Sequence, residues 1–221
     1  MCGRFALYAD LEQLRAALDA GLVPSDYQPR YNIAPTQAVL SLRRIDGEPG
    51  MASLRWGLIP GWSRGPDSRY SMINARAESI ATRPAYRGPF RHRRCLVPAS
   101  GFYEWQTDGQ GPRRPWFVHP RDDTLLLFAG LWERWEGPDG PVDSCTIVTT
   151  TANDTMKALH ERMPVILDAA ARAVWLDPES ERDALQALLR PAPEAALAAY
   201  PVGRQVNNPR HDRPDCVTPA R

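Results

Sequence analysis

The sequence predicts a single α+β domain with a mainly antiparallel, barrel-like β-sheet and peripheral helices. Three observations support this prediction. The length of 221 residues suits one domain. Most of the chain consists of short strand-like runs bounded by Gly or Pro, and helical patterns are few. The 22 prolines are scattered rather than clustered, which indicates ordered loops. We expect one domain over residues 1–221, with its motifs within about 1–166.

The helices are predicted from capping residues and apolar spacing. Asp10 caps a short helix that carries Leu11, Leu14 and Leu18 on one face and stops at Gly21. Asn153 starts another short helix, which must end before Pro164. Residues 22–36 are expected to form an ordered loop. Strands are expected at 37–44, 53–59, 71–76, 94–98, 101–106, 115–119, 124–132 and 144–150, and further helices at 168–176 and 179–190.

Composition excludes several classes of protein. The longest apolar run, Leu125–Trp132, is too short to span a membrane, and the N-terminus lacks the pattern of a secretory signal. The cysteines have no C-x-x-C spacing, which argues against a zinc site and a disulfide framework. We therefore expect a cytoplasmic protein without metal or cofactor. The four cysteines are Cys2, Cys95, Cys145 and Cys216.

Charge is unevenly distributed although the net charge is only +1. The segment Arg64–Arg94 holds eight arginines and two acidic residues, which predicts either a local anion-binding surface or a solvated charged face. The chain has a single lysine, Lys157. Imine chemistry needs an amine, so only Lys157 or the N-terminus could supply one.

Cys2 is the most informative residue. Aminopeptidases usually remove a Met that precedes Cys, and the mature chain would then carry a thiol and an α-amine on one carbon. Their reference pKa values are about 8.5 and about 7.7–8.0, so both are expected to be partly nucleophilic near neutral pH. An amine captures an aldehyde as an imine, and the thiol can close on it as a thiazolidine ring. Cys2 could instead be an acyl-transfer nucleophile or simply a small buried residue.

Two short runs carry further candidate chemistry. In a strand, Asn74 and Arg76 share one face and could hold a small polar group and a neighbouring phosphate, unless that face is only solvated. Glu104 is the lone acid among aromatic residues in Gly101–Trp105. Apolar surroundings would raise its pKa toward the range useful for proton transfer, unless the carboxylate points to water.

A histidine and a tryptophan complete the candidate set. His160 falls at the end of the helix predicted from Asn153, where the helix dipole favours the imidazolium as a proton donor; alternatively it is structural. Trp62 lies by a Gly/Pro turn and could stack on an unpaired base, a contact worth about 1–3 kcal/mol. Trp56 is the better candidate for the core.

Seven segments in this order resemble the SRAP (SOS response-associated peptidase) family, which processes abasic sites in DNA. Each segment alone is weak, but seven in register are specific. They are Met1–Phe5, Tyr31–Thr36, Arg55–Pro60, Asn74–Glu78, Arg94–Pro98, Gly101–Trp105 and His160–Pro164.

The resemblance implies a SRAP domain that binds single-stranded DNA and forms a covalent crosslink to an abasic site. By this resemblance, Cys2 forms the thiazolidine, Asn74 holds the N-terminus and sugar, and Glu104 moves protons and is linked to removal of Met1. His160 would assist sugar-ring opening and crosslink reversal. The protein is expected to be a monomer. The implied DNA contacts are Arg4, Trp62, Arg76, Arg83, Trp105 and Arg162.

Two other functions remain open at this point. An N-terminal-nucleophile amidohydrolase of the glutamine-amidotransferase kind would explain Cys2 and Asn74 but not Glu104 or the arginine-rich segment. A non-catalytic single-stranded DNA-binding module would bind intact and abasic strands equally. No Ser-His-Asp or metalloprotease signature indicates cleavage of other proteins.

Overall fold

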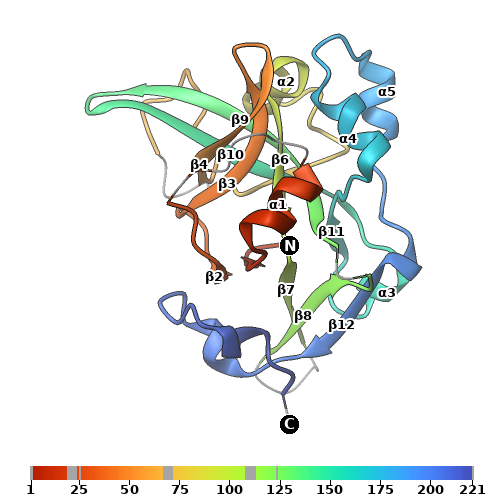
Figure 1. Cartoon of the computed structure of the whole chain (residues 1–221). Helices are drawn as coiled ribbons and strands as arrows, with labels where there is room; N and C mark the ends of the chain where they lie inside the picture. Colours follow the sequence, from red (N-terminus) through yellow and green to blue (C-terminus); the bar gives the residue numbers. More distant parts are fainter. Residues whose placement is uncertain are drawn as a thin grey trace.

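Five strands of the computed structural model close into a small barrel, and a second sheet lies beside it (Figure 1). The structure describes residues 2–18, 24, 26–66, 72–107, 113–122 and 124–220. The strands are β1 (Phe5–Leu7), β2 (Arg30–Ile33), β3 (Ala38–Ile45), β4 (Glu48–Trp56), β5 (Asn74–Arg76), β6 (Arg94–Ala99), β7 (Gly101–Gln106), β8 (Arg114–Pro120), β9 (Leu126–Gly137), β10 (Gly140–Thr151), β11 (Arg162–Pro164) and β12 (Leu197–Pro201). The α-helices are α1 (Leu11–Leu18), α2 (Pro84–His92), α3 (Asp154–Lys157), α4 (Ala169–Leu176) and α5 (Arg182–Ala187).

The barrel runs in the order β10-β4-β3-β6-β9 and closes because β9 also pairs with β10. Most of its pairings are antiparallel, but β10 pairs parallel with β4, with Ser144 opposite Arg55. Apolar side chains such as Leu42, Leu96 and Ile147 are buried, as the removal of apolar surface from water requires. The predicted α+β fold with a barrel-like, mainly antiparallel sheet is confirmed.

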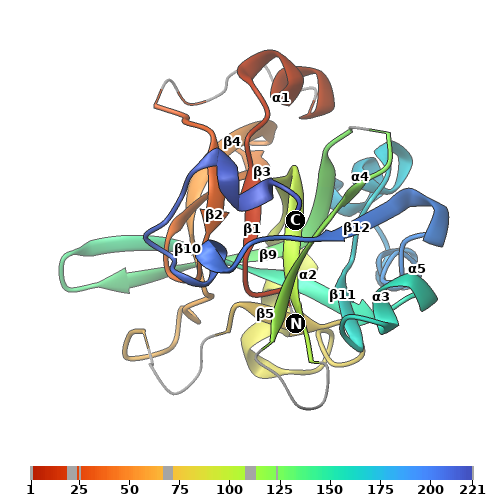
Figure 2. The same ribbon diagram turned by 90° about the horizontal axis from the view of Figure 1, so that it is seen from below.

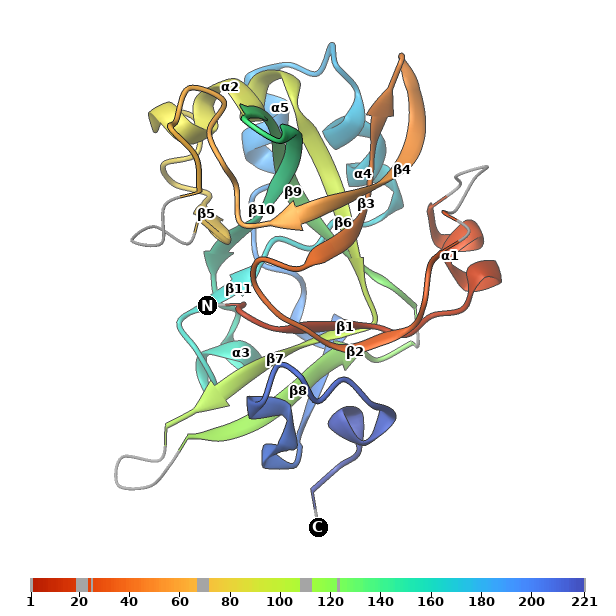
Figure 3. The same cartoon turned by 90° about the vertical axis from the view of Figure 1, so that its left-hand side faces the viewer.

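The second sheet has the order β12-β8-β7-β1-β2 and holds the start of the chain. Phe5 of β1 pairs with Phe102 on one side and Ile33 on the other. Its ring packs edge-on against Trp56 of the barrel, with ring centroids 5.1 Å apart. In Figure 3, β1 accordingly crosses the middle of the molecule, between the barrel and strands β7 and β8. The residues before β1 therefore enter at the junction of the two sheets.

Strand β10 also joins the two short strands that carry predicted motifs. Asn74 and Arg76 of β5 pair parallel with β10, and Arg76 lies opposite Thr149. Thr149 also pairs with Pro164 of β11, so β5 and β11 flank opposite edges of β10. The segments around β5 and β11, which are more than eighty residues apart in the sequence, thereby lie on either side of β10.

The helix starts agree with their predicted caps. Asp10 Oδ1 accepts a hydrogen bond from the Gln13 backbone N–H (2.8 Å), and the Gln13 side chain accepts one from the Asp10 N–H (2.9 Å), which makes a capping box before α1. Leu14 and Leu18 are buried, but Leu11 is 41% exposed. The predicted stop, Gly21, lies outside the described residues. Asn153 caps α3 as predicted, and Asp168, at the start of the predicted 168–176 helix, caps α4.

Several elements differ from the sequence-based expectations. The expected loop 22–36 contains β2, α5 is shorter than 179–190, and α2 was not expected at all. Strands β9 and β10 extend beyond their predicted ranges because they form one long hairpin, in which each strand supplies the other's hydrogen bonds. In the described part of the chain, no helix has the length and apolar character needed to cross a membrane.

Candidate active site and nucleic-acid interface

The backbone of Cys2 is held by Asn74. Asn74 Nδ2 donates a hydrogen bond to the Cys2 carbonyl oxygen at 2.8 Å, and Cys2 is fully buried. Tyr86 of α2 supports the contact by donating to the Asn74 backbone carbonyl at 3.4 Å. Asn74 Oδ1 is buried and has no hydrogen-bond partner among the described residues. Met1, whose removal was expected to free the amine, lies outside those residues.

The Cys2 thiol is not in the state expected from its reference pKa. Burial raises the pKa of this thiol well above its usual range, and the negative charge of Glu104 raises it further. The expectation of a partly ionised thiol near neutral pH is therefore wrong for this folded state. The thiol is neutral here, and any attack by its sulfur requires a group that accepts its proton.

Glu104 is buried beside the start of the chain. It lies on β7, next to Tyr103, whose backbone N–H donates to the Arg4 carbonyl at 2.9 Å. Glu104 is only 3% exposed, and burial raises the pKa of its carboxyl to about 7. The predicted raised pKa is thus supported, and the alternative of a carboxylate pointing into water is excluded. A carboxyl with this pKa can hold or release a proton at neutral pH.

His160 is held in its neutral form. Its Nδ1 accepts a hydrogen bond from the Arg162 backbone N–H at 2.9 Å, which leaves the proton of the neutral ring on Nε2. Burial, as the main cause, lowers the pKa of this imidazole. The expected imidazolium is wrong because α3 ends at Lys157. His160 therefore lies beyond the helix, and desolvation outweighs any helix dipole.

Arg162 is engaged by an acidic residue to which no role was assigned from the sequence. Its NH1 and NH2 donate to the two carboxylate oxygens of Glu78 at 2.7 and 3.0 Å. NH2 also donates to the Thr149 carbonyl at 2.6 Å. No strand pattern in the sequence indicates this pair, because β5 ends at Arg76 and Glu78 lies in the turn that follows.

Two further predicted DNA contacts, Arg4 and Trp105, join the second sheet to the C-terminal segment. Arg4 NH1 donates to Asn32 Oδ1 and to the Val206 carbonyl, both at 2.7 Å. The Arg4 guanidinium lies 5.8 Å from the ring centroid of Trp105, and Trp105 Nε1 donates to Asn207 at 2.7 Å. These internal contacts give both side chains a structural role, and contact with DNA stays a prediction.

The remaining predicted contacts face solvent. Trp62 is 70% exposed, whereas Trp56 is fully buried and donates to the Ile73 carbonyl, so the preference for Trp62 over Trp56 as the exposed ring is confirmed. Arg76 and Arg83 are also exposed. Their exposure leaves them free to meet an anion in solution.

The arginine-rich segment is only partly available to an anion. Arg94 is buried, and its guanidinium donates to backbone carbonyls that include those of Trp175 and Asp177. Arg93 pairs with Glu133 at 2.7 Å. Arg69 lies outside the described residues. The other arginines of the segment are at least partly exposed, namely Arg64, Arg76, Arg83, Arg87 and Arg91.

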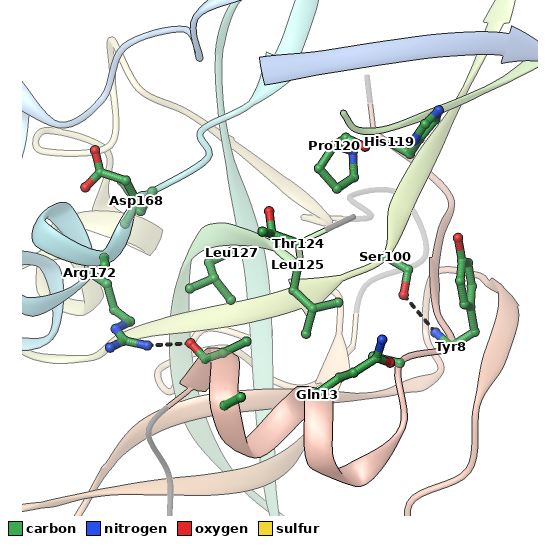
Figure 4. A pocket seen from close by; sticks show the side chains of 15 residues that line it. Tyr8, Gln13, Ser100, His119, Pro120, Thr124, Leu125, Leu127, Asp168 and Arg172 are labelled. Carbon is green, nitrogen blue, oxygen red and sulfur yellow. Dashed lines mark hydrogen bonds between the residues drawn. The ribbon is translucent and has the colours of Figure 1, made fainter. Parts of the chain in front are cut away.

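A large pocket lies elsewhere on the molecule. It has a volume of about 890 Å³ and is formed by α1, the end of β8 and the start of α4. Figure 4 shows Arg172 bonded across it to the Ala17 carbonyl, and Tyr8 bonded to Ser100. The described residues that line it include none of the predicted site residues. In Figures 2 and 3, α1 and β5 lie on opposite sides of the molecule.

One group of side chains has the donor atoms to hold a metal ion. Ligand atoms of His211, Asp215 and Cys216 lie within 4.8 Å of one another. They are already used internally: His211 Nε2 pairs with Asp215 at 2.9 Å, and the Cys216 thiol donates to the His211 carbonyl at 3.3 Å. These contacts hold the C-terminal segment together.

The fold and these contacts define a class: an α+β domain in which Cys2, close to the start of the chain, is buried near Asn74 and the buried carboxyl of Glu104. The sequence model of the SOS response associated peptidase (SRAP) family matches residues 1–209. The chain therefore belongs to the SRAP family, as its sequence motifs predict.

Similar proteins span nearly the whole chain. The abasic site processing protein YoqW of Bacillus subtilis (strain 168) is 38% identical over 221 residues, with 98% of this chain and 99% of YoqW covered. The abasic site processing protein YoaM of the same organism is 40% identical over 216 residues, covering 96% and 95%. A crystal structure of a protein from Bacteroides thetaiotaomicron superposes with a TM-score of 0.87 at 24% identity, covering 99% of this chain and 100% of that one.

Proposed function

We propose that this chain binds single-stranded DNA at abasic sites and traps the sugar aldehyde as a covalent thiazolidine through Cys2 after removal of Met1. The hydrogen bond from Asn74 to the Cys2 carbonyl carries the proposal, because it fixes the residue whose amine and thiol would react. Relatives with 38% and 40% identity are named abasic site processing proteins, which supports the same substrate.

The first step of the reaction joins the α-amine of Cys2 to the ring-opened sugar aldehyde. The amine nitrogen forms a bond to the aldehyde carbon, and loss of water leaves an imine. Proton transfers accompany both the addition and the loss of water. Glu104 can supply and accept these protons near neutral pH, because burial raises the pKa of its carboxyl to about 7.

The second step closes the ring. The sulfur of Cys2 bonds to the imine carbon, and the thiol proton passes to the nitrogen, so no atom is lost. Because the buried thiol is neutral, Glu104 is suited to accept its proton and return it to nitrogen. Ring closure removes the imine, which is the electron sink for β-elimination. The thiol thereby protects the strand from cleavage.

The DNA contacts are part of the proposal. Trp62 would stack on a base, and Arg76 and Arg83 would pair with phosphates, because all three are exposed. Arg76→Ala should then weaken binding to single-stranded DNA while leaving reaction with a free sugar aldehyde unchanged. Equal affinity of the variant and the wild type at moderate salt would contradict this contact.

Intact-mass spectrometry tests the proposal. The purified chain is incubated with single-stranded DNA that carries one abasic site. The mixture is then denatured, and the mass of the protein product is measured. We expect a species equal to the Met1-less protein plus DNA minus water, absent with an intact strand. Failure to form it, with Met1 shown to be absent, would overturn the proposal. Ammonia release from glutamine would then support an amidohydrolase. Equal binding of the intact and the abasic strand would instead support a non-catalytic single-stranded DNA-binding module.

A further inference from the structure

A carboxylate occupies the guanidinium fork of Arg162, one of the predicted DNA contacts. Glu78 takes both terminal nitrogens of Arg162, at 2.7 and 3.0 Å. The remaining contact of NH2 is to the Thr149 carbonyl, and Arg162 Nε is buried without a partner among the described residues. Because Arg162 Nε is buried, a phosphate that binds this guanidinium through two nitrogens must use the same terminal nitrogens, NH1 and NH2. Glu78 and a DNA phosphate therefore cannot both hold this fork.

The two partners differ in their freedom to move apart. The Arg162 side chain is 14% exposed and is tied to β10 through Thr149, whereas the Glu78 side chain is 53% exposed. Glu78 lies in the turn after β5, close enough to Arg76 for its charge to act on the carboxylate. One carboxylate thus pairs with one proposed phosphate contact and partly neutralises another.

We propose that Glu78 is a phosphate surrogate: in the DNA-free protein its carboxylate holds the Arg162 fork, and a backbone phosphate of single-stranded DNA displaces it. This inference rests on the proposed function and adds a residue that sets its affinity. The exchange replaces one anion by another, so Arg162 stays paired throughout. Glu78 turns toward solvent, and its charge disfavours any strand whose phosphate does not reach the fork.

Removal of the charge at Glu78 has an expected sign and size. Glu78→Gln keeps the shape of the side chain but loses the ion pair. Exposed pairs of this kind contribute about 0.2–1 kcal/mol, so the variant should bind intact single-stranded DNA up to about fivefold more tightly. The slope of log K against log salt should stay nearly the same, because Arg162 neutralises one phosphate in both proteins.

Fluorescence anisotropy with an intact, labelled strand measures these quantities without interference from covalent chemistry. Glu12→Gln is the matched control, since it removes one exposed carboxylate from α1, on the opposite side of the molecule from β5. Affinities of wild type, both glutamine variants and Arg162→Lys are measured over a salt series, after thermal melts show that each variant folds. Arg162→Lys keeps the charge but lacks the fork.

The proposal predicts a specific pattern. Glu78→Gln should tighten binding, Glu12→Gln should leave it unchanged, and the gain from Glu78→Gln should shrink in the Arg162→Lys background. Equal or weaker binding by Glu78→Gln, or the same gain with and without the fork, would overturn the surrogate role. If the wild-type chain fails to bind single-stranded DNA even at low salt, the proposed function itself fails, which is a distinguishable result.

Discussion

The Asn74 side-chain amide lies 2.8 Å from the Cys2 carbonyl oxygen and donates to it, across 72 residues of sequence. Strand β5 fixes the amide on one edge of β10, and β1 brings Cys2 to the junction of the two sheets. The contact therefore exists only because both sheets are in place. It makes Asn74 a positioning residue for the proposed nucleophile.

Asn74→Ala should slow crosslinking to abasic DNA by about two- to tenfold, because alanine cannot donate to the Cys2 carbonyl and one hydrogen bond contributes about 0.5–1.5 kcal/mol. Binding of an intact strand should be unchanged. Single-turnover crosslinking on denaturing gels gives the rate, and anisotropy gives the affinity. An equal fall in both quantities would show that Asn74 serves DNA binding rather than Cys2.

Regular strands are the part of the fold that the sequence predicts best. The expected 101–106 strand coincides with β7, since its apolar residues and flanking glycine define it locally. By contrast, β1 and β2 have three and four residues, and each depends on distant pairing, such as Phe5 with Phe102. No local pattern reports such pairing.

Helix α2 shows how tertiary structure can override local preference. Its sequence contains Gly88 and Pro89, which normally interrupt helices. The helix forms because Tyr86 and Phe90 bury against the barrel and Arg94 closes its end by bonding the Phe90 carbonyl. For the site, the sequence supplied the residue types, but burial decided the protonation of Cys2 and His160.

Glu104 should make stability depend on pH in an unusual direction. Its folded pKa of about 7 lies above the usual value of about 4.3. Its contribution to stability is therefore fully present below about pH 4.3 and is lost as the pH rises through 7. The total loss is about 4 kcal/mol, from about 1.4 kcal/mol for each of the roughly 2.7 pKa units between 4.3 and 7.

Glu104→Gln removes this titration while it keeps the shape of the side chain. Urea unfolding of wild type and variant at several pH values isolates the effect, because other carboxyls titrate equally in both proteins. We expect the stability of the wild type to fall relative to the variant between about pH 4.3 and 7. A constant difference across that window would mean that the carboxyl has an ordinary pKa.

His160→Asn should separate the two nitrogens of the ring. The asparagine amide oxygen can still accept from the Arg162 N–H, as Nδ1 does at 2.9 Å, but the Nε2 position is lost. We expect unchanged thermal stability and a slower reversal of the crosslink, by about 10²-fold if Nε2 transfers a proton. Chase of the preformed crosslink with excess abasic strand measures reversal. Unchanged reversal would remove His160 from the chemistry.

Trp62→Ala should weaken binding of single-stranded DNA by about 1–3 kcal/mol, the usual loss for one stacked base. The fold should be unaffected, because this ring is 70% exposed. Trp62→Phe retains an aromatic face and should recover part of the affinity. Anisotropy titrations compare the three proteins. If the Trp62→Ala variant binds single-stranded DNA as tightly as the wild type does, Trp62 does not stack on a base.

Cys2→Ser should convert protection of the strand into its cleavage. The α-amine of the variant can still form an imine, but a hydroxyl closes the ring poorly, so the imine persists and β-elimination proceeds. Cys216→Ser is the matched control, since Cys216 is also a buried cysteine but lies in the C-terminal segment. With Met1 removal verified by mass, an end-labelled abasic strand on a denaturing gel separates crosslinked from cleaved DNA. A Cys2→Ser crosslink as stable as that of the wild type would refute a role for the thiol, because the amine alone would then account for the product.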